Sequence, residues 1–236
     1  MTTATSGAAH KYDSLDRCSI KGNRAVSSGS EVAQAERTAL CDLFVRVGPE
    51  APTLSGDWKT EDLAAHLYVR ERKPFGAMGI LVKRFEARTE KVMADVLASK
   101  GYLGTVEAVR NGPPALLKPL DGMINPIEFF VHHEDVRRGS GQAPARELGG
   151  EADVLWKLLP RFSKALVRGL SDIELSVRRI DNGDTVKLRS GSQPVTITGE
   201  VGEIVLYLYG RKSVARVELD GSHAATGIVS GTAMGL

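Results

Sequence analysis

Residues 125–138 read NPIEFFVHHEDVRR, a helix-sized stretch that sets two adjacent histidines and three acidic side chains among phenylalanine and valine. A structural helix needs an apolar stripe and a solvated face, and it rarely needs imidazole and carboxylate crowded beside the stripe. Residues three or four apart share a helix face, so Glu128, His132 and Asp135 project side by side. The stretch therefore suggests two ligands of a metal ion on one helix of a bundle.

The same residues also have a purely structural interpretation. Asn125 is a good N-cap, Pro126 suits the first helical position, and Glu128 then occupies the third, where a capping box places it. His132 could equally be a core histidine satisfied by a backbone carbonyl. His133 lies about 100° further round the helix and is expected at the surface or its boundary. Spacing alone leaves the metal site and the helix cap both open.

A third metal ligand has to come from another segment, because a catalytic zinc site typically has three protein ligands and one open position. Of the histidines outside the opening stretch, only His66 lies in a convincing helical pattern, EDLAAHLYVRE at residues 61–71. Its apolar neighbours place it near the stripe that faces a bundle interior. Asp135 or Glu134 would orient an imidazole through its far nitrogen, and either of them or Arg70 could serve as an acid or base.

The apolar period divides the 236-residue chain. Residues 1–30 are polar, small and aperiodic, which predicts a disordered tail. The three- to four-residue period that follows predicts an antiparallel helical bundle over residues 31–140, and the Gly/Pro/Ser-rich residues 141–151 predict a linker. Helices are predicted over residues 31–47, 61–72, 81–97, 103–109, 125–138 and 152–167.

Beyond residue 172 the apolar period changes from 3.6 to 2, which predicts strands. An Asn182-Gly183 turn joins the first two of them. Residues 152–236 are therefore expected to form a small α+β domain. Its strands are predicted over residues 173–180, 185–190, 194–199 and 213–219, with a short helix at 201–210.

The charge balance argues against several partners. Lys and Arg number 31 against 29 Asp and Glu, with no block of like charge, so neither nucleic acid nor an anionic membrane is expected to bind. No run reaches the roughly 18 apolar residues of a membrane span, and the first residues lack a signal-peptide pattern, which predicts a cytoplasmic protein. Cys18 and Cys41 are expected to be reduced and structurally minor.

Three segments together resemble the mycothiol-dependent maleylpyruvate isomerase family of actinobacteria. They are the Trp58-x-x-x-Asp62-Leu63-x-x-His66-Leu67 helix, the Glu128-x-x-x-His132-x-x-Asp135 helix, and LYLYGR at residues 206–211. The stretch RERKP at residues 70–74 and the opening stretch look especially like an actinobacterial branch known only as metal-binding proteins. The resemblance covers about residues 31–236. It implies a DinB/YfiT-like metal-binding bundle followed by a sterol-carrier-like α+β domain.

The resemblance implies a divalent metal, usually zinc, held by His66, Glu128 and His132. Related bundles often use three histidines, so Glu128 looks more like the isomerase branch. The family also uses an arginine from its C-terminal half, for which Arg211 is the candidate, although its position alone suggests a residue that stabilises a helix end. In the family, mycothiol adds to an activated double bond, permits rotation and leaves.

The expected function is therefore a mycothiol-dependent metalloenzyme, an isomerase or S-transferase, with its pocket between bundle and C-terminal domain. Its partners would be a small-molecule thiol and a substrate, and since related bundles often pair through helices, a homodimer is a further expectation. One alternative is a metal-binding sensor or scaffold without turnover. Another is a structural helical protein whose C-terminal domain carries an apolar ligand, because fold does not fix function.

Overall fold

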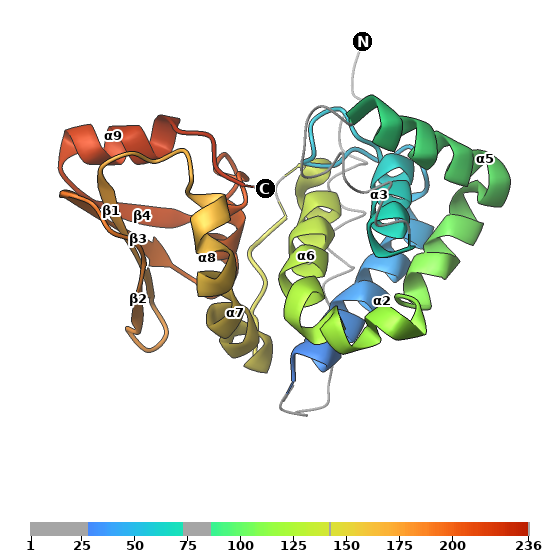
Figure 1. The fold of residues 1–236 in the computed structure, drawn as a ribbon, viewed down its shortest axis with the longest axis horizontal. Coiled ribbons are helices and arrows are strands. Elements are labelled where there is room, and N and C mark those ends of the chain that lie inside the picture. The colour runs from blue at the N-terminus through green and yellow to red at the C-terminus, as the bar shows by residue number, and fades with distance from the viewer. Residues whose placement is uncertain (1–27, 73–85, 142, 236) are drawn as a thin grey trace, which may run out of the picture.

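Helices make up the N-terminal half, as the apolar spacing predicts (Figure 1). The computed structural model describes residues 28–72, 86–141 and 143–235, so the predicted tail lies outside the described residues up to residue 27. Ser28 caps the first helix in a capping box with Glu31, and the helix therefore begins before the predicted boundary at residue 31. The long helices of this half are α2 (Gly29–Val47), α3 (Thr60–Arg72), α5 (Glu86–Arg110) and α6 (Lys118–Gly139), with a 3-10 turn at Ala115–Leu117.

Two of these helices differ from the prediction. The helices predicted over residues 81–97 and 103–109 are joined in α5 across a kink at Gly101, where φ is 66°, and residues 81–85 lie outside the described residues. Helix α6 begins at Lys118, so Asn125 lies inside it and cannot cap it. The capping-box interpretation of Glu128 is therefore wrong. The amide of Asn125 instead donates to Glu71 and Asp121.

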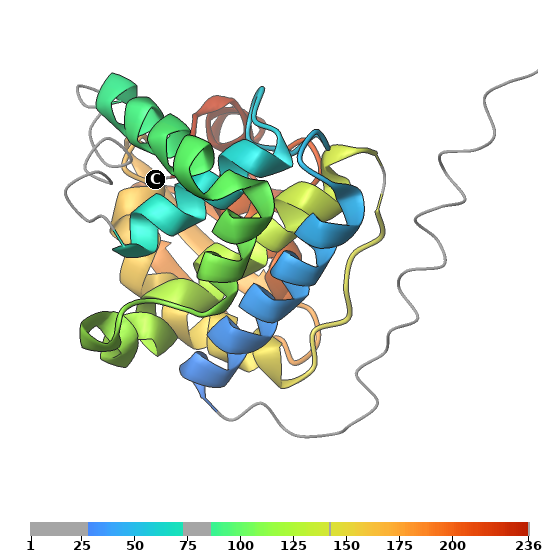
Figure 2. The same cartoon turned by 90° about the vertical axis from the view of Figure 1, so that its right-hand side faces the viewer.

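Helices α2 and α6 run side by side in Figure 2 and are in close contact at a pair of glycines. A Cβ atom on Gly29 would lie 2.0 Å from the carbonyl oxygen of Gly122. A Cβ atom on Gly122 would lie 2.6 Å from the backbone nitrogen of Ser30. No side chain fits between these two backbones, so the contact requires glycine on both helices.

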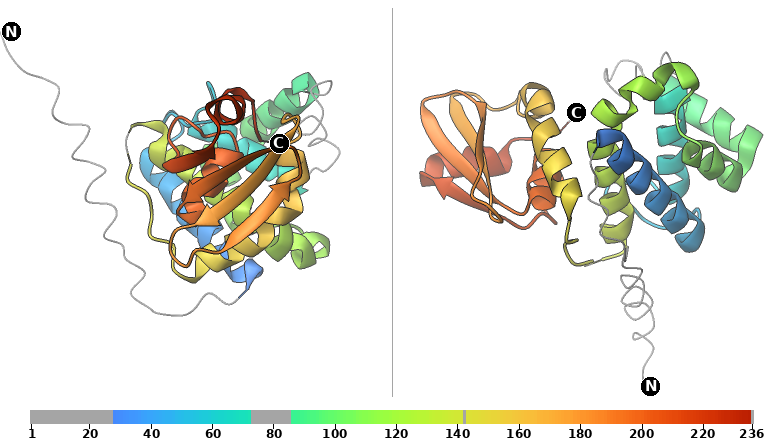
Figure 3. Two further views of the ribbon diagram at one scale, coloured as in Figure 1. Left: turned by 90° about the vertical axis from the view of Figure 1, so that its left-hand side faces the viewer. Right: turned by 90° about the horizontal axis from the view of Figure 1, so that it is seen from below.

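The C-terminal half is a four-stranded sheet with helices against it. Its strand order is β2-β1-β3-β4, with β1 antiparallel to β2, β1 parallel to β3, and β3 antiparallel to β4. Helices α7 and α8 lie between the sheet and α6, as the view from below in Figure 3 shows. The elements are α7 (Gly150–Leu166), β1 (Ile173–Arg179), β2 (Thr185–Arg189), β3 (Gln193–Gly199), α8 (Val201–Leu208), β4 (Val217–Gly221) and α9 (His223–Gly231).

This half confirms the first three predicted strands and the helix between the third and fourth. The fourth strand begins at Val217 and not at residue 213, because residues 209–216 turn back from α8 as a loop. Helix α9 was not predicted at all. Its sequence, HAATGIVSG, is dominated by small residues, and only Ala225 and Val229 are buried, which leaves almost no apolar period to detect.

Helix α6 contributes to two hydrophobic cores at once. Phe129 packs with α2 and α3 residues in the core of the bundle. Ile127, Phe130 and Val131 pack instead with α7, α8 and the sheet in the core of the C-terminal half. The apolar residues of the opening stretch therefore face both ways, and none of residues 125–138 is fully exposed.

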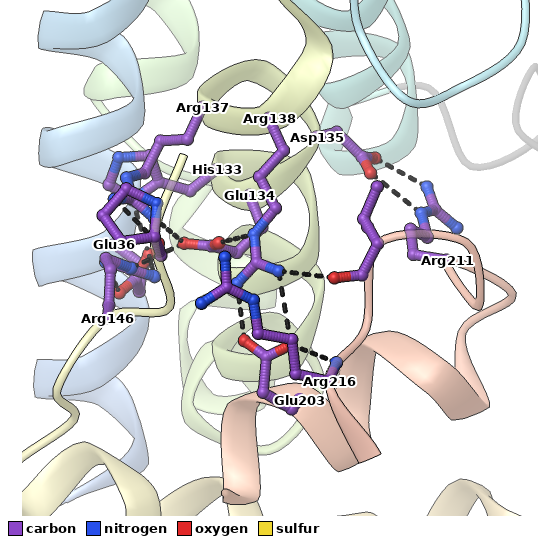
Figure 4. Close-up of polar contacts among 12 residues, drawn as sticks. Glu36, His133, Glu134, Asp135, Arg137, Arg138, Arg146, Glu203, Arg211 and Arg216 are labelled. Atoms are coloured by element: carbon purple, nitrogen blue, oxygen red, sulfur yellow. Dashed lines mark hydrogen bonds and ion pairs between the residues drawn. The ribbon is translucent and has the colours of Figure 1, made fainter. Parts of the chain in front are cut away.

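Buried charges on α6 have partners from other elements (Figure 4). His133, expected at the surface, is only 8% exposed, because α2 packs over it, and its Nδ1 lies 2.8 Å from Oε2 of Glu36. Arg146 donates to both oxygens of Glu36 and, at 2.7 Å, to Glu134. Burial alone would raise the pKa of Glu36, but Arg146 and His133 lower it to about 2. The irregular residues 143–149 are thus fixed to the bundle by an ionic network.

Two smaller predictions concern cysteine and membranes. Cys41 is a buried free thiol whose pKa is raised to about 12 by burial, whereas Cys18 lies outside the described residues. Within the described ranges, no helix combines the length and apolarity that crossing a bilayer would require.

Replacing Gly122 with alanine tests the close contact of α2 and α6. We expect Gly122→Ala to lower the free energy of unfolding by about 1–3 kcal/mol, because the new methyl group forces the two backbones apart. Gly104→Ala is the matched control, since its Cβ atom would meet only Lys100 Cβ at 3.5 Å in an exposed part of α5. That change should stabilise the protein by about 0.4–1 kcal/mol. Urea unfolding measures both, and a Gly122→Ala protein as stable as wild type would contradict the contact.

Candidate metal centre

Three possible metal ligands from two helices converge beside the bundle core. His66 projects from α3, and Glu128 and His132 project from α6. One ligand atom from each residue lies within 4.8 Å of the other two. Nε2 of His132 lies 3.3 Å from Oε1 of Glu128, and Nε2 of His66 lies 3.9 Å from the same oxygen. The structure thus brings together the three residues that were singled out from the sequence.

The donor set and the spacing both suit a divalent cation. A tetrahedral zinc ion with bonds of about 2.0–2.1 Å has ligand atoms about 3.3 Å apart, which matches His132 with Glu128 and is shorter than the 3.9 Å between His66 and Glu128. The burial of the His66 imidazole is stronger evidence for a bound cation than the spacing. His66 is 5% exposed, and its Nδ1 is buried without a hydrogen-bond partner among the described residues, while its Nε2 faces Oε1 of Glu128 at 3.9 Å. A buried ring nitrogen without a partner is costly unless a ligand satisfies it.

Asp135 orients the second imidazole. Its Oδ2 lies 2.9 Å from Nδ1 of His132, so Nδ1–H donates to the carboxylate and Nε2 is the nitrogen that faces Glu128 and His66. Burial alone would raise the pKa of Asp135, but hydrogen bonds from His132 and Arg211 hold it well below its usual range. Asp135 is therefore a carboxylate, as this role requires.

Arg211 reaches Asp135 from the C-terminal half. Its Nε donates to Oδ1 at 2.8 Å and its Nη2 donates to Oδ2 at 2.6 Å, a bidentate pair. Ser55, from the loop before α3, also donates to Oδ2 at 2.9 Å. The carboxylate that orients His132 is thus held by α6, by a loop of the bundle and by the C-terminal half together.

Arg70 supports the third ligand in a similar way. Its Nε lies 3.1 Å from Oε1 of Glu128, and its Nη1 donates to Oδ1 of Asn125. Asn125 in turn donates to Glu71 and Asp121, which both pair with the fully buried Arg37. A chain of polar contacts therefore connects Glu128 to the interior of the bundle.

The pKa shifts fit a site that binds a cation. Burial lowers the pKa of His66, which keeps this ring neutral near pH 7. Burial alone would raise the pKa of Glu128, but the charge of Arg70 and the contact with His132 hold it well below its usual value. Burial would also lower the pKa of His132, yet Asp135 and Glu128 raise it, so a metal ion would compete with a proton for Nε2.

Not every residue singled out from the sequence lies here. Glu134 accepts hydrogen bonds from Arg137, Arg138 and Arg146, and among the described residues these arginines, not an imidazole of the metal site, are its partners. The reason is the helix geometry, since Glu134 is about 100° from Asp135 around α6. Ser55 could not be singled out from the sequence, because a single serine in a loop carries no pattern.

Trp58 forms one wall of the site. Its ring centroid lies 5.1 Å from that of His66, and the His66 and His132 rings are 5.2 Å apart in an edge-on arrangement. The side chains of the three possible ligands are 7%, 14% and 9% exposed for His66, Glu128 and His132. The site is therefore screened from bulk water without being fully closed.

The comparisons with known proteins support the fold. No protein-family model and no curated protein sequence matches this chain. Among solved structures, the mycothiol-dependent maleylpyruvate isomerase is similar with a TM-score of 0.52 at 13% identity, over 81% of this chain and 91% of that one. A structure of a histidine-to-alanine mutant of the mycothiol-dependent maleylpyruvate isomerase gives a TM-score of 0.53 at 15% identity, with the same coverage. At this identity the likeness concerns the fold: a helical N-terminal half followed by a small four-stranded sheet.

Replacing Asp135 with asparagine tests the orientation of His132. An amide lacks the charge that holds Nδ1–H, so we expect Asp135→Asn to weaken zinc binding by about 10–100-fold. Asp95→Asn is the control, because Asp95 lies on the exposed face of α5 and its partner among the described residues is the exposed Lys91. Competition with a chromophoric zinc chelator measures both affinities. Equal affinity of Asp135→Asn and wild type would show that this carboxylate does not support a ligand.

Proposed function

We propose that this protein holds a divalent metal ion on His66, Glu128 and His132 and uses it to activate a small thiol or a water molecule. The observation that carries the proposal is the convergence of two imidazoles and a carboxylate, together with the buried Nδ1 of His66, which has no hydrogen-bond partner among the described residues. Zinc is the metal we expect, because imidazole nitrogen and carboxylate oxygen suit it and the set has three members.

When bound, such a metal lowers the pKa of a thiol or water at its open position and supplies a nucleophile near pH 7. The protein's own residues prepare the site for it. Asp135 fixes the tautomer of His132, and Arg70 and His132 keep Glu128 ionised. Trp58 and the surrounding helices screen the site from water, which strengthens every electrostatic contact inside it.

The proposed cosubstrate is a low-molecular-weight thiol, specifically mycothiol, and the proposed reaction is an isomerisation or an S-transfer. Two lines of support are the three-ligand set and the fold likeness to an isomerase described as mycothiol-dependent. Arg211 and Arg70 lie beside the ligands and are the candidates for contact with the second substrate. Arg211 already makes hydrogen bonds to Asp135, Ser55 and the carbonyl of Tyr209, so orienting Asp135 is its first role.

The proposal also covers the folds of the two halves, the place of the substrate pocket, the oligomeric state and the cellular location. The bundle is proposed to be DinB/YfiT-like over residues 31–140, and residues 152–236 to be sterol-carrier-like, with residues 141–151 joining them. The substrate pocket is proposed to lie between these halves, where Arg211 meets Asp135. A homodimer and a cytoplasmic location complete the proposal.

A second candidate is a metal-holding sensor or scaffold without turnover. The low exposure of the three ligand side chains favours it, since a substrate must reach the open position. The number of ligands favours the enzyme, because structural zinc sites usually have four protein ligands. Access of a thiol to the bound metal distinguishes the two candidates.

Elemental analysis of the purified protein after dialysis tests the metal centre itself. We expect about one equivalent of zinc or a similar metal in wild type and none in His66→Ala or His132→Ala, with all three proteins folded. His223→Ala is the matched control, because His223 is exposed at the start of α9 and should leave the metal content unchanged. A wild-type protein that stays free of metal after zinc is added would overturn the proposal.

A further inference from the structure

The loop of residues 209–216, between α8 and β4, carries Arg211 and contacts α6 at two points. The first is the bidentate pair of Arg211 with Asp135. The second is Arg138, whose Nη1 donates to the carbonyl oxygen of Val214 at 3.1 Å. Asp135 and Arg138 are three residues apart on α6, so both contacts lie on the same face of that helix (Figure 4).

Glu203, on α8, completes the second contact. Its Oε1 accepts from Nη2 of Arg138 at 2.6 Å, and its Oε2 accepts from the backbone nitrogen of Arg216 at 2.7 Å. Arg138 and Glu203 together therefore hold the loop by the carbonyl of Val214 and the amide of Arg216. Within the loop, the amides of Val214 and Ala215 donate to the carbonyl oxygen of Arg211. The path from Arg138 to Arg211 is thus only two hydrogen bonds long.

The charges in this contact are deeply buried. Arg138 is 4% exposed and Glu203 is 3% exposed, and Nε of Arg138 donates to the fully buried Glu134 at 2.6 Å. Apolar side chains of similar volume would fill this space with a smaller desolvation penalty. The planar fork of the guanidinium offers instead fixed directions to three acceptors at once. An apolar residue at position 138 could not hold the 209–216 loop in a fixed direction.

We propose that Arg138 is a positioning residue for Arg211. It fixes the 209–216 loop where the Arg211 guanidinium meets both oxygens of Asp135, and so it helps to fix the imidazole of His132. The placement of Arg211 on Asp135 stands without a metal, whereas the effect on metal affinity rests on the proposed function. The two parts are therefore tested by separate measurements.

Amide hydrogen exchange of the metal-free protein, followed by NMR, tests the placement. We expect Arg138→Met to accelerate exchange at Ala215 and Arg216 by at least about tenfold relative to wild type, because the loop then opens locally. Arg179→Met is the matched control, since Arg179 is 5% exposed and pairs with Asp153 and Asp181 at the end of β1. Unchanged loop exchange in Arg138→Met, or equal acceleration in Arg179→Met, would overturn the proposal.

A double-mutant cycle with Arg211→Met tests whether Arg138 acts through Arg211 on the metal site. We expect each single change to weaken zinc binding by about tenfold or more, and the double variant to bind zinc as Arg211→Met does. Independent, additive losses would contradict a path through Arg211. A wild type that binds no zinc would overturn the proposed function, and the exchange experiment would still decide the placement.

A milder variant covers the case in which Arg138→Met does not fold. Arg138→Lys keeps the charge but offers a single nitrogen, which cannot replace the fork that joins Glu203, Val214 and Glu134. We expect accelerated exchange at Ala215 and Arg216, smaller than in Arg138→Met. Wild-type exchange in a folded Arg138→Lys protein would show that the fork does not hold the loop.

Discussion

Burial of α6 between two hydrophobic cores is the constraint on which the rest of the structure depends. Phe129 faces the bundle, while Phe130 and Val131 face the sheet and its helices. Residues 125–138 of this helix are covered on both sides and have no exposed position, so each of their charges must be paired or must bind a ligand. His133 pairs with Glu36, and Glu134 with three arginines. Glu128 and His132 are left to face His66, beside Arg70 and Asp135.

This constraint explains which inferences from the sequence were confirmed. The helical half and the change to period 2 follow from local spacing, and the structure contains them. Spacing places Glu128 and His132 on one helix face, and the packing of α3 against α6 brings His66 to them. Spacing could not show a second core on the far side of α6, so His133 was wrongly expected at the surface or its boundary. It also placed a helix start at Asn125, because Pro126 is usual there and its tolerance inside α6 depends on tertiary contacts.

The polar contacts around the candidate site were the feature of the structure that was hardest to predict from the sequence. Asp135 could be named, because it lies three residues after His132 on the same face, and Arg211 because it ends a recognisable segment. Ser55, Arg138 and Glu203 could not, since each reaches its partner across a long sequence separation and none carries a local pattern. These contacts connect both halves of the chain to one imidazole, so the geometry of the site depends on how the halves meet.

Zinc-edge X-ray absorption of the zinc-loaded protein, recorded with and without a low-molecular-weight thiol, tests the central claim most directly. The account predicts imidazole nitrogens and carboxylate oxygen at about 2.0–2.1 Å from zinc, and one added sulfur at about 2.3 Å when mycothiol is present. It predicts that dialysed His132→Ala, which has lost a ligand, gives no zinc-edge signal. A spectrum without imidazole, or one that the thiol leaves unchanged, would contradict a metal centre with a position open to a thiol.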